Sequence, residues 1–351
     1  NAGEAGYIQS SLGNKNLQWE VSRNFDVAVE FGFLNKVRGS IEYFNRQSSN
    51  LLFSVPLSFS TGMESQDMNA GSMYNRGIEV EINTNIFDRK DFTWDVNVNA
   101  THIKNKVTDL PVDPFISGKH KVEEGHSRYE FYLRQWRGVD PATGSSLYLP
   151  NETALKESES LVDVNGTTYT TNINEALEDY SGDAMPKVSG GISTNLTYKG
   201  FNLALTFYYQ LGGKMYDTAY SSLMSPGTGS LSYSTMHVDI LKRWQKPGDI
   251  TNVPRVSNGS DATNLTGSST QWLVSSNMLE LSTINFGYTF PKTWISRFSL
   301  SDLKLYFSAE NVFQITKRQG IYPRKNISGY ASNGDVYLPS RVFTMGLNLT
   351  F

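Results

Sequence analysis

In Arg341-Val-Phe-Thr-Met-Gly-Leu-Asn-Leu-Thr-Phe351, apolar and polar side chains alternate to the last residue. The apolar members share one parity: Phe343, Met345, Leu347, Leu349 and Phe351. A period of two indicates a β-strand whose two faces meet different surroundings. A transmembrane barrel strand, with lipid outside and a polar lumen inside, has this pattern. An amphipathic edge strand of a soluble β-protein has it too, so the remaining segments must decide between the two.

The same alternation recurs along the whole chain, and no segment carries an apolar stripe with the 3.6-residue period of a helix. The sequence therefore predicts an all-β protein. The alternating segments lie at 25–33, 41–43, 78–82, 92–98, 129–133, 188–198, 201–209, 284–290 and 303–307.

Composition excludes several classes of function. The net charge of −3 argues against a nucleic-acid partner. Cysteine is absent, and the four histidines have no metal-binding spacing, so no zinc or other cofactor site is expected. No nucleophile motif, phosphate-binding loop or calcium loop occurs, so we expect a protein that is not an enzyme. No run of 18 apolar residues could form a membrane-spanning helix, but barrel strands need apolar residues only at alternate positions.

Connection lengths predict the direction of each strand. Tight turns at 35–36, 88–90 and 199–200 contrast with long polar loops at 54–73, 151–185, 212–271 and 315–336. Outer-membrane barrels place short turns in the periplasm and long loops outside. We assume that the last strand runs towards the periplasm and alternate the strand directions back from it. All the long loops then lie outside only if one more strand lies at 145–150, after a periplasmic turn at 139–144. The total is then about eleven strands, and since complete bacterial barrels have even numbers, we expect a fragment.

Short motifs then resemble one family, the SusC/RagA-like TonB-dependent outer-membrane transporters, and the resemblance extends over essentially all 351 positions. The terminal pattern Thr344, Gly346, Leu349 and Phe351 is similar to the C-terminal signal by which outer-membrane barrels are recognised for insertion. Seven further motifs occur in the family's order: Asn14-Lys-Asn-Leu-Gln-Trp-Glu20, Asn69-Ala-Gly-Ser-Met-Tyr-Asn-Arg-Gly-Ile-Glu79, Lys104-Asn-Lys-Val-Thr108, Glu124-Gly125, Gly138-Val-Asp-Pro-Ala-Thr-Gly144, Phe286-Gly-Tyr-Thr-Phe-Pro291 and Ala309-Glu-Asn-Val-Phe313.

This resemblance implies a transmembrane antiparallel β-barrel of 22 strands with an N-terminal plug, of which residues 1–351 would be the second half. The plug and the first barrel strands would then lie outside this chain. It implies TonB-dependent import of oligosaccharides or oligopeptides across a bacterial outer membrane, with a SusD-like lipoprotein as lid. The implied partners are that lipoprotein, the rest of the same transporter, TonB and outer-membrane lipid, and two transporter–lid pairs could form a dimer.

Two groups of residues are the candidate sites. Inward-facing polar residues would contact the plug or simply form a solvated wall: Glu30, Glu42, Glu79, Glu81, Asp95 and Asn97. Aromatic residues of the outer loops would contact the substrate, contact the lid or pack internally: Tyr216, Tyr220, Tyr233, Trp244, Trp272, Tyr322 and Tyr330. A complete passive porin and a secreted carbohydrate-binding β-protein remain as alternative functions for the chain.

Overall fold

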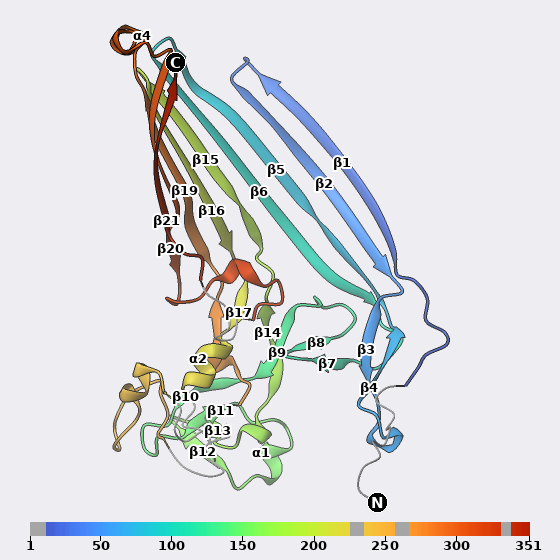
Figure 1. The fold of residues 1–351 in the computed structure, drawn as a ribbon. Coiled ribbons are helices and arrows are strands. Elements are labelled where there is room, and N and C mark those ends of the chain that lie inside the picture. The colour runs from blue at the N-terminus through green and yellow to red at the C-terminus, as the bar shows by residue number, and fades with distance from the viewer. Residues whose placement is uncertain (1–11, 225–234, 257–266, 331–337) are drawn as a thin grey trace, which may run out of the picture.

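One antiparallel sheet of nine long strands dominates the computed structural model, which describes residues 12–224, 235–256, 267–330 and 338–351 (Figure 1). All neighbouring strands pair in an antiparallel manner. In spatial order they are β1 (Val21–Phe33), β2 (Val37–Ser49), β5 (Ser72–Arg89), β6 (Phe92–Asp109), β15 (Val188–Tyr198), β16 (Phe201–Leu211), β19 (Met278–Thr289), β20 (Asp302–Thr316) and β21 (Val342–Thr350).

The register of the sheet separates an apolar face from a polar face. One row across β5, β6, β15 and β16 reads Ile82, Val98, Ile192 and Phe207. The next row, one residue along, reads Asn83, Asn97, Ser193 and Thr206. We call the first face the outer face and the second the inner face. Because residues directly opposite each other in a sheet share a face, the alternation seen in the sequence extends across the strands.

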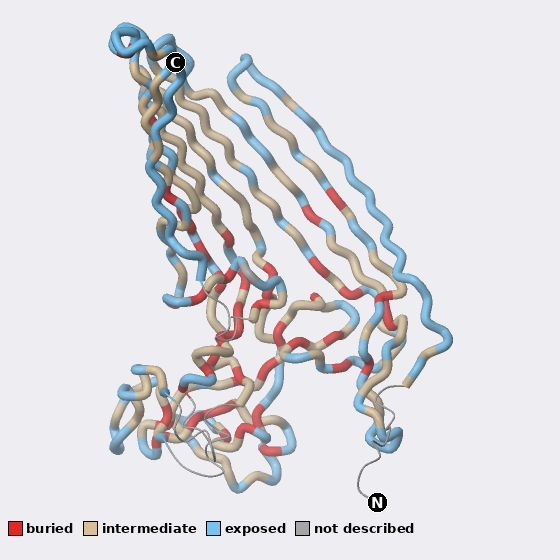
Figure 2. Tube along the Cα trace, viewed as in Figure 1, coloured by how far each residue is buried: buried red, intermediate tan, exposed pale blue. Residues whose placement is uncertain are grey.

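The sheet has almost no buried core of its own (Figure 2). Its residues are mostly intermediate or exposed, whereas the buried residues gather where the loops lie. Phe25, Val29 and Phe343 are 60%, 64% and 63% exposed on the outer face. A band of apolar side chains this large is stable only when something other than water covers it. Lipid is the covering that a transmembrane β-sheet requires.

Tight turns and long loops lie at opposite ends of the sheet (Figure 1). The turn end carries the connections 34–36, 90–91 and 199–200, with positive φ at Asn35, Lys199 and Gly200. It also carries α4 (Lys292–Ile295). The loop end carries the described parts of the connections 50–71, 110–187, 212–277 and 317–341. The predicted alternation of short and long connections is therefore confirmed.

The predicted number of strands is wrong: the residues that the structure describes form a sheet of nine strands, not eleven. The segments expected at 129–133 and 145–150 form β9 (Glu130–Arg134) and β11 (Ser146–Tyr148), which belong to two small separate sheets. Strands of five and three residues are too short to span a membrane, which takes about 9–11 residues. The turn 139–144 accordingly lies at the loop end, not at the inner end. Because two consecutive strands are absent from the sheet, the predicted directions of all the other strands are unchanged.

The described loops at that end build a domain around four small buried clusters. Short elements compose it: β3 (Leu52–Pro56), β4 (Ser65–Asn69), β7 (Phe115–Ser117), β8 (His120–Val122), β10 (Trp136–Val139), α1 (Ala154–Glu157), β12 (Leu161–Val164), β13 (Thr167–Thr170), β14 (Glu178–Asp183), β17 (Lys214–Tyr216), α2 (Thr218–Leu223) and β18 (Leu273–Ser275). The largest core contains Phe131, Leu133, Tyr216 and Trp272. Among the described residues, no helix is long and apolar enough to cross a membrane.

The edge strands β1 and β21 do not pair with each other, so these nine strands form an open sheet. A complete porin would require closure between the first and last strands of the chain. The described part of the chain does not meet that condition.

Candidate functional site

The inner face brings the six predicted wall residues onto one surface. Glu42 lies directly opposite Glu79, and Glu30 and Glu81 both lie opposite Ser40. Asp95 and Asn97 occupy the same face further towards the turn end. Two carboxylates that face each other directly repel, so this part of the wall is suited to an environment that supplies water or cations.

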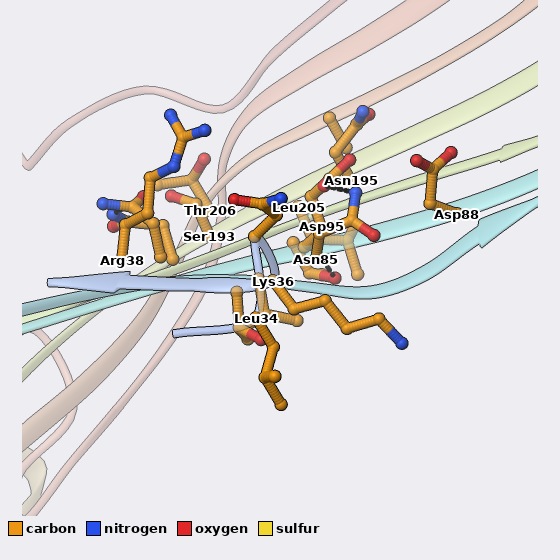
Figure 3. Close-up of a pocket in the computed structure, with 17 residues that line it drawn as sticks. Leu34, Lys36, Arg38, Asn85, Asp88, Asp95, Ser193, Asn195, Leu205 and Thr206 are labelled. Atoms are coloured by element: carbon orange, nitrogen blue, oxygen red, sulfur yellow. Dashed lines mark hydrogen bonds between the residues drawn. The ribbon is translucent and has the colours of Figure 1, made fainter. Parts of the chain in front are cut away.

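Hydrogen bonds between side chains fix this wall. The Asn97 amide donates to Glu81 Oε1 at 3.0 Å and to Asn83 Oδ1 at 2.6 Å. The Asn85 amide donates to Asp95 Oδ1 at 2.8 Å. A hollow of about 610 Å³ opens on the same face, lined by Arg38, Asp95, Ser193, Asn195 and Thr206 among others (Figure 3). The wall can bind polar surfaces and water.

Two of the predicted loop aromatics are buried. Tyr216 is 2% and Trp272 is 3% exposed, and both belong to the largest core of the loop-end domain. Burial raises the pKa of the Tyr216 phenol above its ordinary value. Side chains enclosed to this degree cannot contact a ligand or a lid without unpacking the domain. Their burial favours internal packing over contact with substrate or with a lid.

Tyr220 belongs to a charged cluster that joins two loops. The Arg318 guanidinium lies 3.5 Å from the centroid of the Tyr220 ring and 3.3 Å from Asp217 Oδ2. Asp217 is 2% exposed and also accepts a hydrogen bond from the Tyr220 amide at 2.9 Å. The Tyr220 hydroxyl donates to Asp239 at 3.0 Å. This cluster ties the loop after β20 to the loop after β16.

Trp244 packs on the turn that carries the Gly138–Gly144 motif. Its indole nitrogen donates to the Pro141 carbonyl at 2.9 Å, and its ring covers Gly144. Gly144 has a φ of +75°, and a Cβ there would clash with that ring. Gly144→Ala is therefore expected to destabilise this docking by about 1–3 kcal/mol, through backbone strain and loss of packing. Hydrogen exchange of residues 237–255 in the full-length protein measures this, and unchanged protection would contradict it.

Tyr322 and Tyr330 hold the last loop in place. The Tyr330 hydroxyl accepts a hydrogen bond from the Lys119 amide at 2.8 Å, and the Tyr216 amide donates to the Gly329 carbonyl at 2.7 Å. Tyr322 donates to Glu280 at 3.3 Å. Tyr233 lies in 225–234, outside the described residues.

A buried histidine, which sequence reasoning did not select, adds to this attachment. His120 is 3% exposed, its Nε2 lies 3.0 Å from the Ser328 carbonyl, and its ring packs on Phe131. Burial is the main cause that lowers the pKa of His120 below the ordinary 6.5, and the nearby Arg128 acts in the same direction. Desolvation disfavours the charged imidazolium, so the native fold favours the neutral ring.

The stability contributed by neutral His120 is expected to depend on pH. A folded-state pKa below the unfolded value of 6.5 means that this stability is complete above about pH 6.5 and declines as the pH falls further. Hydrogen exchange of residues 326–330 at pH 7.5 and 5.5 measures the effect, with faster exchange expected at pH 5.5 after correction for intrinsic rates. In His120→Phe the difference should vanish, and persistence of the full difference in that variant would contradict the assignment.

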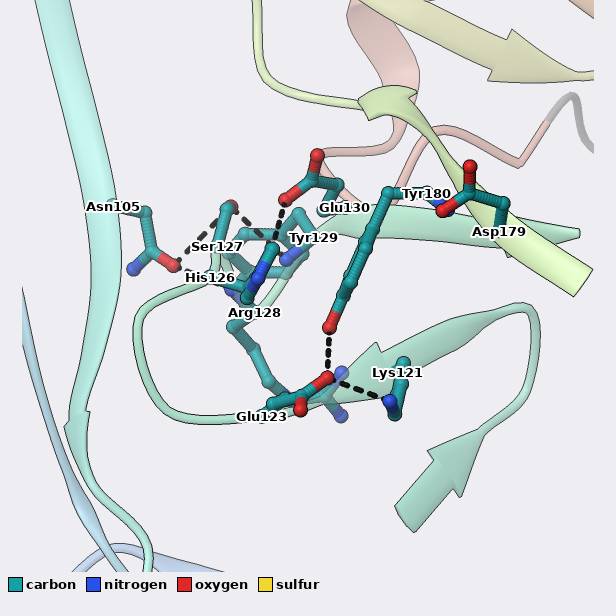
Figure 4. Close-up of polar contacts among 10 residues, drawn as sticks. All are labelled: Asn105, Lys121, Glu123, His126, Ser127, Arg128, Tyr129, Glu130, Asp179 and Tyr180. Carbon is teal, nitrogen blue, oxygen red and sulfur yellow. Dashed lines mark hydrogen bonds and ion pairs between the residues drawn. The ribbon is translucent and has the colours of Figure 1, made fainter. Parts of the chain in front are cut away.

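A second polar cluster lies between β8, β9 and β14 (Figure 4). The Tyr180 hydroxyl donates to Glu123 at 2.5 Å, and Lys121 pairs with the same carboxylate at 2.6 Å. These two contacts lower the pKa of Glu123. The Tyr180 ring stacks on His126 at 3.8 Å, and His126 in turn contacts Glu130 at 3.0 Å. Sequence alone could not assemble this cluster, because Tyr180 lies 57 positions from Glu123 in the chain.

Neither cluster, as far as the structure describes them, has the composition of a metal centre. Within the described ranges, no three His, Asp or Glu side chains are placed to hold a metal ion. The charged groups of the two clusters pair with one another, as Arg318 does with Asp217 and Lys121 with Glu123. The arrangement is that of a structured, polar and aromatic surface.

The residues of the terminal pattern divide between the two faces of β21. Thr344 and Gly346 lie opposite Ser308 and Tyr306 on the inner face, and Leu349 lies opposite Leu303 on the outer face. Phe351 follows the strand and is 87% exposed. Tyr306 covers Gly346, and a Cβ at that position would clash with its ring. Their proposed role in insertion stays a prediction.

An amphipathic antiparallel sheet with short turns at one end and a loop domain at the other defines a barrel protein of the outer-membrane class. Within that class, the chain belongs to the TonB-dependent receptor-like β-barrel family, whose model matches residues 2–312. This family is one of outer-membrane proteins, and membership argues against a secreted carbohydrate-binding protein.

Curated relatives agree with this assignment. The chain is 27% identical to TonB-dependent receptor P3 of Formosa agariphila over 99% of its length, which spans 36% of that protein. It is 25% identical to TonB-dependent receptor SusC of Bacteroides thetaiotaomicron, over 96% of this chain and 32% of SusC. The chain thus spans about a third of the length of the curated relatives it matches.

Solved structures agree on the fold. The RagAB peptide transporter superposes with a TM-score of 0.79 at 23% identity, over 97% of this chain and 36% of that one. The open–open state of the RagAB peptide importer gives a TM-score of 0.75 at 22% identity, over 97% of this chain and 36% of that one. The prediction of a SusC/RagA-like barrel wall is confirmed at the level of family and fold.

Proposed function

We propose that residues 1–351 form the C-terminal part of the barrel wall of a TonB-dependent importer in a bacterial outer membrane. The observation that carries this proposal is the nine-stranded sheet with an apolar outer face and a polar, hydrogen-bonded inner face, in a chain of the TonB-dependent receptor-like family. The turn end then lies in the periplasm and the loop domain outside. The plug and the other barrel strands belong to the same polypeptide and face the inner wall.

The proposed substrates are oligosaccharides or oligopeptides too large for passive pores. A SusD-like lipoprotein covers the loop domain as a lid, and two such pairs can associate as a dimer. The names of the relatives support this: SusC is a curated relative, and RagAB is described as a peptide transporter. Among the described residues, Tyr220, Trp244, Tyr322 and Tyr330 remain candidates for contact with substrate or lid, since each retains partial exposure.

Uptake by cells that produce the full-length protein tests the proposal. Labelled oligosaccharides and oligopeptides are offered separately, with and without a protonophore, and in cells with and without TonB. Import of one class that stops without TonB or with the protonophore is the expected result. Uptake that continues in both conditions would identify a passive porin. Loss of the lid lipoprotein should reduce import without removing the transporter from the outer membrane.

A further inference from the structure

Basic residues gather on the outer face of the sheet, at the loop end of β1, β2, β5 and β6. One cross-strand row there reads Phe25, Asn45, Arg76 and Lys104. The next row towards the loops reads Arg23, Gln47, Tyr74 and Lys106. The basic patch is defined as Arg23, Arg76, Lys104 and Lys106, and neither row contains an acidic residue.

The patch is not neutralised by ion pairs within the described part of the chain. Its four members take part in none of the ion pairs found there. Arg76 and Lys104 lie directly opposite each other on neighbouring strands, about 5 Å apart at the backbone, where like charges destabilise a sheet. Arg23, Arg76 and Lys104 are exposed, and Lys106 is half-buried. Such an arrangement favours the binding of an anion that is not part of this chain.

The height of the patch on the sheet indicates where that anion lies. On β5 the outer face is apolar from Phe87 to Ile78 except at Thr84, over nine residues or about 30 Å at ~3.3 Å per residue. A strand tilt of ~40° leaves roughly 23 Å, close to the ~25 Å height of the apolar band of an outer-membrane barrel. Arg76 follows Ile78 directly on this face. The patch therefore begins where the hydrocarbon ends.

The opposite edge of the band has a different character. At the turn end, outer-face rings lie close together, with Phe87 and Trp94 centroids 6.0 Å apart and Phe92 and Tyr198 centroids 6.4 Å apart. Aromatic rings suit an interface made of ordinary phospholipid head groups. The two edges of one sheet are thus built for different head groups.

We propose that the basic patch binds the phosphate groups of lipopolysaccharide in the outer leaflet. The inference rests on the proposed outer-membrane orientation, in which the loop end faces outward. Four strands about 4.8 Å apart spread the cationic groups over roughly 14 Å, wide enough to engage more than one phosphate of a single glycolipid head group. Asn45, Gln47 and Tyr74 add hydrogen-bonding groups in the same two rows. Arg76 also stacks on Tyr74, with Cζ 4.3 Å from the ring centroid, which holds the guanidinium at the surface.

Binding to the purified full-length transporter tests the proposal. Native mass spectrometry counts bound lipid after titration with lipopolysaccharide, enzymatically dephosphorylated lipopolysaccharide, phosphatidylglycerol or sodium phosphate. Intact lipopolysaccharide should bind best. Arg76→Gln with Lys104→Gln should weaken its affinity roughly ten- to thirty-fold. The charge-matched control, Arg89→Gln with Lys90→Gln at the turn end, should leave it unchanged.

Several results would overturn the proposal. These are equal affinity in the Arg76/Lys104 variant, equal loss in the turn-end control, equal binding of the dephosphorylated glycolipid, or tighter binding of phosphatidylglycerol. If the glutamine variant does not fold, Arg76→Lys with Lys104→Arg keeps both charges and must retain binding. Import and outer-membrane localisation are measured in the cells from which each transporter is purified. If the transporter imports normally but its binding of lipopolysaccharide does not depend on the patch, this inference alone is refuted. If the wild-type protein is not located in the outer membrane, the proposed function is refuted.

Discussion

Ile192→Arg is expected to lower the free energy of unfolding of the membrane-embedded full-length transporter by about 2–4 kcal/mol. Ile192 lies in the middle of β15, opposite Val98 on one side and Phe207 on the other, on the outer face. A guanidinium at that height has no water and no partner in the hydrocarbon. The cost is therefore that of placing a charge near the bilayer midplane.

Ser193→Arg is the matched control, one residue further along the same strand. Ser193 lies opposite Asn97 and Thr206 on the inner face and lines the polar hollow (Figure 3). A charge there stays hydrated, so the expected change is below about 1 kcal/mol. The difference is measured by unfolding both variants with urea in lipid vesicles. The folded fraction is monitored by the heat-modifiable mobility of the protein on gels. Equal effects, or a larger effect at Ser193, would contradict the assignment of faces.

Arg318→Met is expected to destabilise the loop domain locally by about 3–5 kcal/mol, because it leaves the buried Asp217 carboxylate without its cation. It also removes the contact with the Tyr220 ring. The last loop should then separate from the loop after β16. Hydrogen exchange of residues 214–223 and 317–330 in the full-length protein measures the change, and both segments should lose protection together.

Lys242→Met controls for the loss of a positive charge. Lys242 pairs with Asp239 at 2.7 Å in the same region, but its side chain is 73% exposed. An ion pair in water contributes at most about 1 kcal/mol, so exchange should change little. If both variants behave alike, the buried pair does not hold the last loop.

Sequence periodicity was sufficient to predict the long strands of the sheet, but not to exclude the short strands of the loop domain. Strands such as β15 and β16 alternate over eleven residues each, and the tight turn at 199–200 joins them in register. Alternation alone shows that one face is apolar, but not whether lipid or a protein core covers it. In β9 the apolar members Phe131 and Leu133 face a core, and only the short length of the strand distinguishes the two cases.

The loop residues were harder to predict. Tyr216 and Trp272 have the same side-chain chemistry as exposed binding aromatics, and burial depends on contacts between distant loops that no local pattern encodes. Pairs such as Arg318 with Asp217 are separated by about a hundred positions in the chain. By contrast, Glu42, Glu79 and Asn97 share one face of the sheet, because strand parity and register determine the face of each residue.

A cysteine scan of β15 tests the central claim that one face of this sheet meets lipid and the other a polar lumen. The chain contains no native cysteine, so single nitroxide labels can be placed at residues 188–198 in turn in the full-length transporter in lipid vesicles. Outer-face positions 190, 192, 194, 196 and 198 should show high collision rates with oxygen, and the odd positions should instead be accessible to a water-soluble nickel reagent or shielded by the plug. Oxygen accessibility without a period of two, or with its maxima at the odd positions, would contradict the account.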